Sequence, residues 1–144
     1  LPNVTLITDV RDCLVIHAPD ICNTLITTND LVALENKNEF RWLGRIDNVI
    51  NSGGIKFIPE QIEAKLTSKI TSRFFIAGIP DALLGEKIVV FVEGEKKSLE
   101  PQIFDCLEKF ERPKEIYFIP KFMESNQKIK RLEIKEQFIK ENLP

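Results

Sequence analysis

The sequence predicts an α+β protein in two parts: a β-rich N-terminal piece of a larger subdomain, followed by a small α+β domain. Before about residue 45, short alternating and apolar runs separated by turn residues predict strands. Beyond that point, apolar stripes at helical spacing alternate with continuous apolar runs, which are typical of strands covered on both faces. We therefore expect strands within residues 1–45, and about three strands and three helices within residues 46–144.

The first part contains turn signals that mark the ends of its strands. Ala18-Pro19-Asp20 ends an apolar run, and residues 36–38 form a hairpin turn. A piece of this size has too little core of its own, so it belongs to a larger β-subdomain. Strands are expected at residues 4–10, 13–17, 25–28, 32–34 and 40–43.

The second part opens with a hairpin expected over residues 47–57, and Pro59 follows at a plausible first helical position. Ile62, Leu66 and Ile70 form a stripe at spacing four, which predicts the first helix. Further helices are expected over residues 99–110 and around Ile134 and Phe138, and buried strands at residues 74–77, 88–92 and 116–119.

Composition excludes several classes of protein. Twenty Lys and Arg against 22 Asp and Glu give a net charge of −2, which argues against a broad nucleic-acid surface. No apolar run approaches a membrane span and no signal peptide is visible, so we expect a soluble cytoplasmic protein without membrane partners. The chain opens at Leu1 without an initiator methionine, which predicts a fragment of a longer protein.

The cysteines and the histidine do not suggest a metal site. Cys13, Cys22 and Cys106 are odd in number and lack the paired spacing of zinc ligands, so we expect reduced, buried thiols. His17 alternates with Cys13 and Val15 along a strand, without a partner that suggests a triad. We expect it to be structural.

The N-terminal part carries two candidate ligand-binding motifs. In residues 27–31, Asp30 at a strand end can accept two hydrogen bonds from a sugar diol, although a simple turn explains the same residues. In residues 44–54, Arg45 presents a planar fork suited to ribose or phosphate oxygens. Gly53 and Gly54 let the backbone approach a ligand closely, or only make a turn.

The C-terminal part carries two more motifs. Residues 78–86 lie between two buried strands and read as a structural loop, in which Pro80 fixes φ and Gly85 takes a left-handed conformation. Lys128, in the polar stretch 126–131, can reach an anionic site as a mobile point charge. Three bases within four residues are otherwise an ordinary solvated surface.

Taken in order, the four motifs resemble the adenylate-forming (AMP-binding) superfamily, which includes acyl-CoA synthetases, luciferases and the adenylation domains of peptide synthetases. Asn29 stands where the family has Gly, which the left-handed tolerance of Asn would explain, and Gln127 replaces the Gly before the lysine. The similar segments are residues 28–30 (Thr-Gly-Asp), residues 44–63 (the hinge motif), residues 78–86 (a family loop) and residues 127–131 (Gly-Lys-Ile-x-Arg).

The resemblance implies a role for each matching residue. Asp30 would bind both ribose hydroxyls of ATP, helped by Arg45, and Asp47 would be the hinge of a mobile C-terminal domain. Lys128 would bridge the substrate carboxylate and the α-phosphate during adenylation. After the domain has rotated, the loop of Ser52, Gly53 and Gly54 would line the tunnel for the CoA pantetheine arm.

The resemblance also implies what the chain lacks. Residues 1–45 would be the end of a large ATP-binding domain, whose missing N-terminal part supplies the Gly-rich phosphate loop, the acyl pocket and the main magnesium ligands. The fragment alone would be inactive, and we expect no metal site within it. ATP, magnesium and CoA would serve the whole enzyme, which activates a small carboxylic acid.

Within the family, residues 54–59 and 112–118 are most similar to bacterial o-succinylbenzoate–CoA ligases of menaquinone biosynthesis. Two alternatives stay open: the adenylation domain of a peptide synthetase, and a non-catalytic binding module of the same fold. The presence of Asp30, Arg45 and Lys128 argues against the second.

Overall fold

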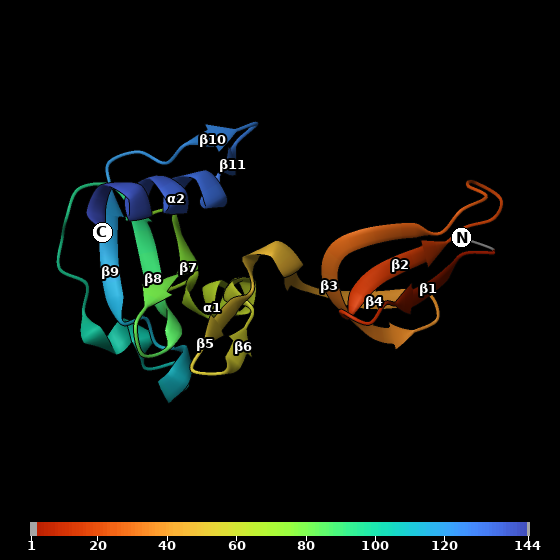
Figure 1. Cartoon of the computed structure of the whole chain (residues 1–144), viewed down its shortest axis with the longest axis horizontal. Coiled ribbons are helices and arrows are strands. Elements are labelled where there is room, and N and C mark those ends of the chain that lie inside the picture. The colour runs from red at the N-terminus through yellow and green to blue at the C-terminus, as the bar shows by residue number, and fades with distance from the viewer. Residues whose placement is uncertain (1–2, 144) are drawn as a thin grey trace. The chain divides into compact units, whose positions relative to one another are not determined.

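The structure is a computed structural model that describes residues 3–143 and divides into two compact units, Leu1–Val49 and Ile50–Pro144 (Figure 1). The sequence predicts the division after residue 45, and the contacts within the chain divide it after Val49. The outer ends of the two predicted parts, residues 1, 2 and 144, lie outside the described residues.

The first unit is an antiparallel sheet in the order β1-β2-β3-β4, followed by a single 3-10 turn, η1. Leu6, Leu14 and Val32 form its small core, in keeping with a piece that has little apolar interior of its own. The elements are β1 (Thr5–Thr8), β2 (Cys13–His17), β3 (Ile26–Asn36), β4 (Glu39–Arg45) and η1 (Ile46–Asn48).

Strand β3 corrects one expectation. The sequence predicts two strands separated by a turn at residues 28–30, whereas β3 runs through these residues without a break. The polar residues stay extended because the strand accommodates them: Thr28 Oγ1 donates to the Leu14 carbonyl at 2.8 Å. The irregularity that the polar residues suggested is a β-bulge between Leu31 and Val32.

The second unit is built on a sheet in the order β6-β5-β8-β7. Strand β9 also pairs with β8, in parallel, along residues Val89 to Glu93. A separate two-stranded hairpin, β10–β11, precedes the last helix (Figure 1). The elements are β5 (Ile50–Ser52), β6 (Ile55–Phe57), α1 (Pro59–Leu66), β7 (Phe74–Asp81), β8 (Gly85–Glu93), β9 (Glu115–Ile119), β10 (Glu124–Ser125), β11 (Lys128–Ile129) and α2 (Arg131–Asn142).

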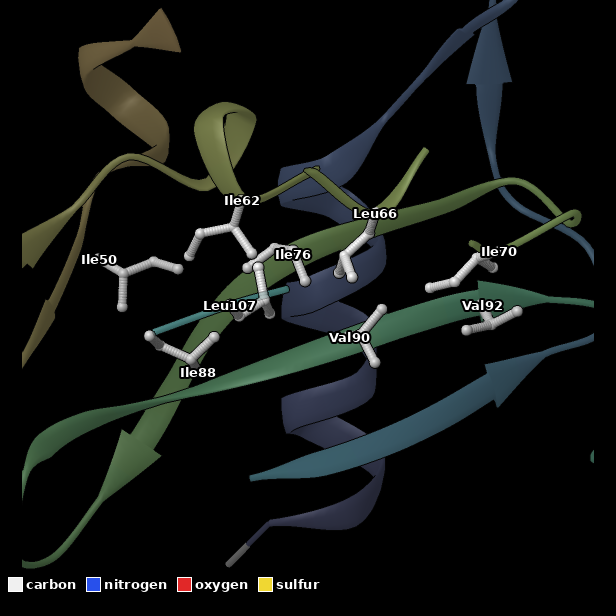
Figure 2. Close-up of a cluster of buried hydrophobic side chains, with 9 residues drawn as sticks. All are labelled: Ile50, Ile62, Leu66, Ile70, Ile76, Ile88, Val90, Val92 and Leu107. Carbon is white, nitrogen blue, oxygen red and sulfur yellow. The ribbon is translucent and has the colours of Figure 1, made fainter. Parts of the chain in front are cut away.

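Strands β7 and β8 bury side chains on both faces, as their continuous apolar runs predict. On one face, Ile76, Val90 and Val92 pack against Ile62 and Leu66 of α1 (Figure 2). The alternate residues of the same strands point to α2, which passes behind the sheet in Figure 2. The core on this second side consists of Phe75, Ala77, Ile79, Val89 and Phe91 of the two strands, with Phe122 and Ile134 packed against them.

The predicted α+β class is confirmed, but the helix expected over residues 99–110 is wrong. Within residues 3–143 the α-helices are α1 and α2, and the segment forms two 3-10 turns, η2 (Pro101–Phe104) and η3 (Lys109–Glu111). A capping box between Glu108 and Glu111 begins η3 and divides the segment. In such a helix Ile103, Leu107 and Phe110 would face inward, but only Leu107 is buried: it is 3% exposed, whereas Phe110 is 68% exposed.

Two smaller expectations also need correction. The predicted loop over residues 78–86 is mostly strand, because Asp81 pairs with Gly85 and leaves residues 82–84 as the turn. Gly85 does take the left-handed conformation, with φ +82°. Of the three free thiols only Cys13 is buried, while Cys106 is exposed.

The described part of the chain contains no helix that is long and apolar enough to cross a membrane.

Candidate functional site

Asp30 and Arg45 face each other across strands β3 and β4. They are register partners, and Arg45 Nη1 donates to Asp30 Oδ1 at 3.1 Å. Trp42, on β4, donates its indole N–H to the same oxygen at 3.2 Å. Both of these hydrogen bonds are made to Oδ1, and the Asp30 side chain is 30% exposed. The carboxylate is therefore held in place and reachable from solvent, an arrangement that suits a hydroxyl-bearing ligand.

The neighbouring Asn29 does not use the left-handed conformation that the sequence suggested. It lies within β3, outside the set of residues with positive φ. Its Oδ1 accepts a hydrogen bond from Arg11 Nη1 at 3.1 Å, and Arg11 also donates to the Thr28 carbonyl. Arg11 in turn pairs with Asp9, and this hydrogen bond lowers the pKa of the Asp9 carboxyl. Asn29 thus serves as a side-chain acceptor for Arg11.

Sequence reasoning missed Arg11 and Trp42 as members of this site. Arg11 is far from Asp30 in the sequence, and only the pairing of β2 with β3 brings it close. Trp42 carried a usable signal, because it is the one tryptophan and lies just before Arg45 in the same strand. An exposed aromatic residue beside a candidate ligand carboxylate is a signal for a binding surface.

Asp47 lies in η1, just ahead of the boundary between the two units. Its Oδ2 is 3.8 Å from Arg45 Nη2, and its side chain is 66% exposed. Such an exposed pair contributes little to stability. The residue is thus placed where a change in backbone angles would not disturb a packed core.

The loop of Ser52, Gly53 and Gly54 is the turn of the β5–β6 hairpin. Gly53 and Gly54 have φ values of +60° and +82°, which L-residues rarely adopt, so the turn itself favours glycine at both positions. Gly53 N donates to the Leu84 carbonyl at 2.9 Å, which fastens the turn to the β7–β8 hairpin. Around Gly54 an added Cβ would meet nothing within 4 Å.

Lys128 is exposed on the short β10–β11 hairpin, where it pairs with Ser125. The turn between them consists of Asn126 and Gln127, with φ values of +51° and +65°. Asn enters this region more readily than most residues, but Gln does so at a cost of about 1 kcal/mol or more. Gln127, which stands where the family has Gly, therefore keeps the backbone conformation that Gly would favour.

An ion-pair network lies beside Glu124, at the start of this hairpin. Arg73 pairs with Glu93 at 2.7 Å through Nη2 and with Glu124 at 2.5 Å through Nη1. Glu93 also accepts a hydrogen bond from Phe122 N at 2.8 Å. The Arg73 guanidinium, followed by this N–H, lowers the pKa of Glu93 to about 2.

A second ion pair lies after the hairpin. Arg131, the first residue of α2, makes a two-pronged contact with Glu63 of α1. Glu63 also accepts a hydrogen bond from Ile76 N at 3.0 Å, and the guanidinium lies over the Phe75 ring. Burial raises the pKa of Glu63, whereas Arg131 acts in the opposite direction. The last residue of the Gly-Lys-Ile-x-Arg motif thus has a structural partner in the hinge motif.

The candidate residues are distributed over both units. Asp30, Arg45 and Asp47 lie in the first, while the β5–β6 turn and Lys128 lie in the second. Within the second unit, the two candidate loops lie at opposite ends of β8. Ser52 pairs with Gly85 at one end, and the Arg73 network holds the other end at Glu93 (Figure 1). Over residues 3–143, no three His, Cys, Asp or Glu residues gather closely enough to hold a metal ion.

Comparison with known proteins identifies the family. No family model matches the sequence. The acyl-CoA synthetase ALT10 of Alternaria alternata is 32% identical over 107 residues, which are 67% of this chain and 19% of that protein. The crystal structure of an acyl-CoA synthetase (AMP-forming)/AMP-acid ligase II-like protein from Dyadobacter fermentans is 34% identical, with a TM-score of 0.60 over 95% of this chain and 42% of that one.

The chain belongs to the AMP-forming acyl-CoA synthetase family. The resemblance found in the sequence motifs is thereby confirmed at the level of the family. An E. coli MenE structure with bound OSB-AMS shares the fold, with 22% identity and a TM-score of 0.74 over 99% of this chain and 35% of that one. The chain thus spans less than half the length of each of these proteins.

Proposed function

We propose that this chain is the C-terminal part of an ATP-dependent acyl-CoA ligase, which adenylates a carboxylic acid and passes the acyl group to CoA. Residues 1–45 would end the large ATP-binding domain, and residues 46–144 would form the mobile domain. One observation carries the proposal: in a chain of this family, Asp30 and Arg45 pair across two strands while Lys128 is exposed on a hairpin.

In the adenylation step, the substrate carboxylate attacks the α-phosphate of ATP. The new bond joins a carboxylate oxygen to phosphorus, and pyrophosphate leaves with the electrons of the broken P–O bond. Two anions approach one another, so a preorganised cation stabilises the transition state. We assign this role to Lys128, and the ribose contacts to Asp30 and Arg45.

In the second step, the CoA thiol attacks the acyl carbonyl, forms the thioester and releases AMP. We assign the passage of the pantetheine arm to the turn of Ser52, Gly53 and Gly54, and the hinge between the two steps to Asp47. Magnesium would accompany ATP and bind mainly to the remainder of the enzyme, so no residue of this chain is assigned to it. The chain alone would not turn over.

For the substrate we propose o-succinylbenzoate, which would place the enzyme in menaquinone biosynthesis in the cytoplasm. Residues 54–59 and 112–118 support this choice, and the E. coli MenE structure, which shares the fold, carries OSB-AMS. The choice of substrate is tested by measuring pyrophosphate release by the full-length enzyme with a panel of aromatic carboxylic acids, aliphatic carboxylic acids and amino acids. Preference for an amino acid would instead support the peptide-synthetase alternative.

The Lys128→Ala variant of the full-length enzyme tests the mechanism. Adenylation should fall by about 10²–10³-fold, because one preorganised charge is lost from the transition state. Thioester formation from a supplied acyl-adenylate should stay near the wild-type rate. Lys130→Ala, which removes a nearby exposed cation, is the matched control and should leave both steps unchanged. Normal adenylation by Lys128→Ala would overturn the proposed function, since a solvated surface charge predicts that result.

A further inference from the structure

We propose that Glu124 and Arg73 are positioning residues for Lys128, and that they fix the hairpin in the orientation required for adenylation. This inference rests on the proposed function of Lys128. It adds a role for two residues outside the motifs that the sequence singled out.

The hairpin has few means of holding itself. It consists of two residue pairs, Glu124 with Ile129 and Ser125 with Lys128. Its residues from Glu124 to Lys128 are exposed, and of the hairpin's residues only Ile129 packs against the core. An isolated two-stranded hairpin is marginally stable at best in water. The direction of Lys128 therefore depends on contacts that tie the hairpin to the rest of the unit.

Arg73, which lies just before β7, supplies such a contact. Its Nη1 lies 2.5 Å from Glu124 Oε2, while Nε and Nη2 hold both carboxylate oxygens of Glu93. Glu93 ends β8, and its second partner is Phe122 N, two residues before the hairpin. The guanidinium also lies over the Phe122 ring, which is buried in the core. One guanidinium thus connects the central sheet with Glu124.

The Arg73–Glu124 ion pair differs in burial from the Arg131–Glu63 ion pair, which follows the hairpin in the chain. Glu63 is the more buried carboxylate, so its removal would leave a partly buried cation and would destabilise the fold. The Glu124 side chain is 38% exposed, and its removal leaves Arg73 paired with Glu93. Truncation of Glu124 therefore releases the hairpin without opening the core.

The experiment uses the full-length enzyme with Glu124→Ala and measures the two steps separately. We expect adenylation kcat to fall by about tenfold, because a small displacement of a catalytic group is costly while an exposed ion pair fixes it only moderately. The KM for ATP and thioester formation from supplied acyl-adenylate should stay within about twofold of wild type. Glu124→Gln, which keeps an acceptor without the charge, should give an intermediate rate.

The second measurement is amide hydrogen exchange of residues 124–129 in the same proteins. Glu124→Ala should speed exchange in this segment and leave β7 and β8 unchanged. Glu95→Ala is the matched control, because it removes an exposed carboxylate just after β8 and should change neither quantity.

The outcomes separate this inference from the proposed function. If Lys128→Ala abolishes adenylation while Glu124→Ala keeps normal adenylation and normal exchange, the positioning role is wrong and the proposed function stands. If Glu124→Ala slows both steps equally, the ion pair is merely structural and the inference is also overturned. If Lys128→Ala adenylates normally, the proposed function fails, and the positioning role fails with it.

Discussion

At the scale of single residues, the left-handed turn before Lys128 is the most informative feature. Asn126 and Gln127 both adopt positive φ, although only Asn does so readily. The sequence comparison with Gly-Lys-Ile-x-Arg located this position but left the path of the backbone open. The structure resolves it as a two-residue hairpin turn in which Gln127 is strained.

Gln127→Gly should therefore stabilise the protein, because Gly takes the left-handed region at no steric cost. We expect the free energy of unfolding to rise by up to about 1 kcal/mol, part of the gain being offset by the greater entropy of Gly in the unfolded chain. Urea titration measures the change. Asn126→Gly is the control and should gain less, so an equal or larger gain there would contradict the explanation.

At the scale of elements, the glycine turn of the β5–β6 hairpin limits how its proposed role can be tested. A side chain introduced in place of Gly53 would lie against Leu84. A bulky residue at this position would therefore distort the turn as well as block a ligand. Gly54 faces open space. A fold-preserving test therefore uses Gly54, with a residue that tolerates positive φ.

Gly54→Asn should obstruct the pantetheine arm while keeping the turn. In the full-length enzyme, we expect thioester formation to fall by at least about tenfold and adenylation to stay near the wild-type rate. Gly85→Asn is a matched control, since Gly85 also has φ +82° but lies outside the proposed tunnel loop. Equal losses of thioester formation in the two variants would show that strain, not obstruction, is responsible.

Sequence reasoning located most elements of the second unit, because their apolar periods were unambiguous. The strands around Ile76 and Val90 and the stripe of Ile62 and Leu66 lie where the pattern predicts them. The helix predicted over residues 99–110 fails because apolar spacing does not reveal that a capping box interrupts the segment. Nor could a single sequence reveal the contacts of Arg73, which depend on the meeting of three segments distant in the chain.

At the scale of the whole molecule, acid should weaken the second unit through Glu93. The pKa of Glu93 is lowered from 4.5 to about 2, so its ionised form is favoured by folding. The resulting stability is fully present above the unfolded value and is lost as pH falls toward the folded value. Glu63 acts with the opposite sign, because its pKa is raised and protonation favours the folded state.

In Glu93→Gln, the free energy of unfolding should therefore fall less steeply than in the wild type between about pH 5 and pH 2.5. Urea midpoints measured across this range test the expectation. Glu95→Gln, which removes a nearby exposed carboxylate, is the control and should keep the wild-type slope. An unchanged slope in Glu93→Gln would mean that the Arg73 network does not govern acid sensitivity.

The placement of the two candidate loops at opposite ends of β8 also bears on how such an enzyme can evolve. The strand has nine residues, which separates its ends by roughly 25–30 Å. Substitutions so far apart, with no shared partners, usually combine additively. On the proposed assignment, substitutions near Lys128 that change adenylation would therefore leave thioester formation at the glycine turn unchanged. If Lys128 and the glycine turn act as proposed, the buried strand between them would let the two activities vary separately within one small domain.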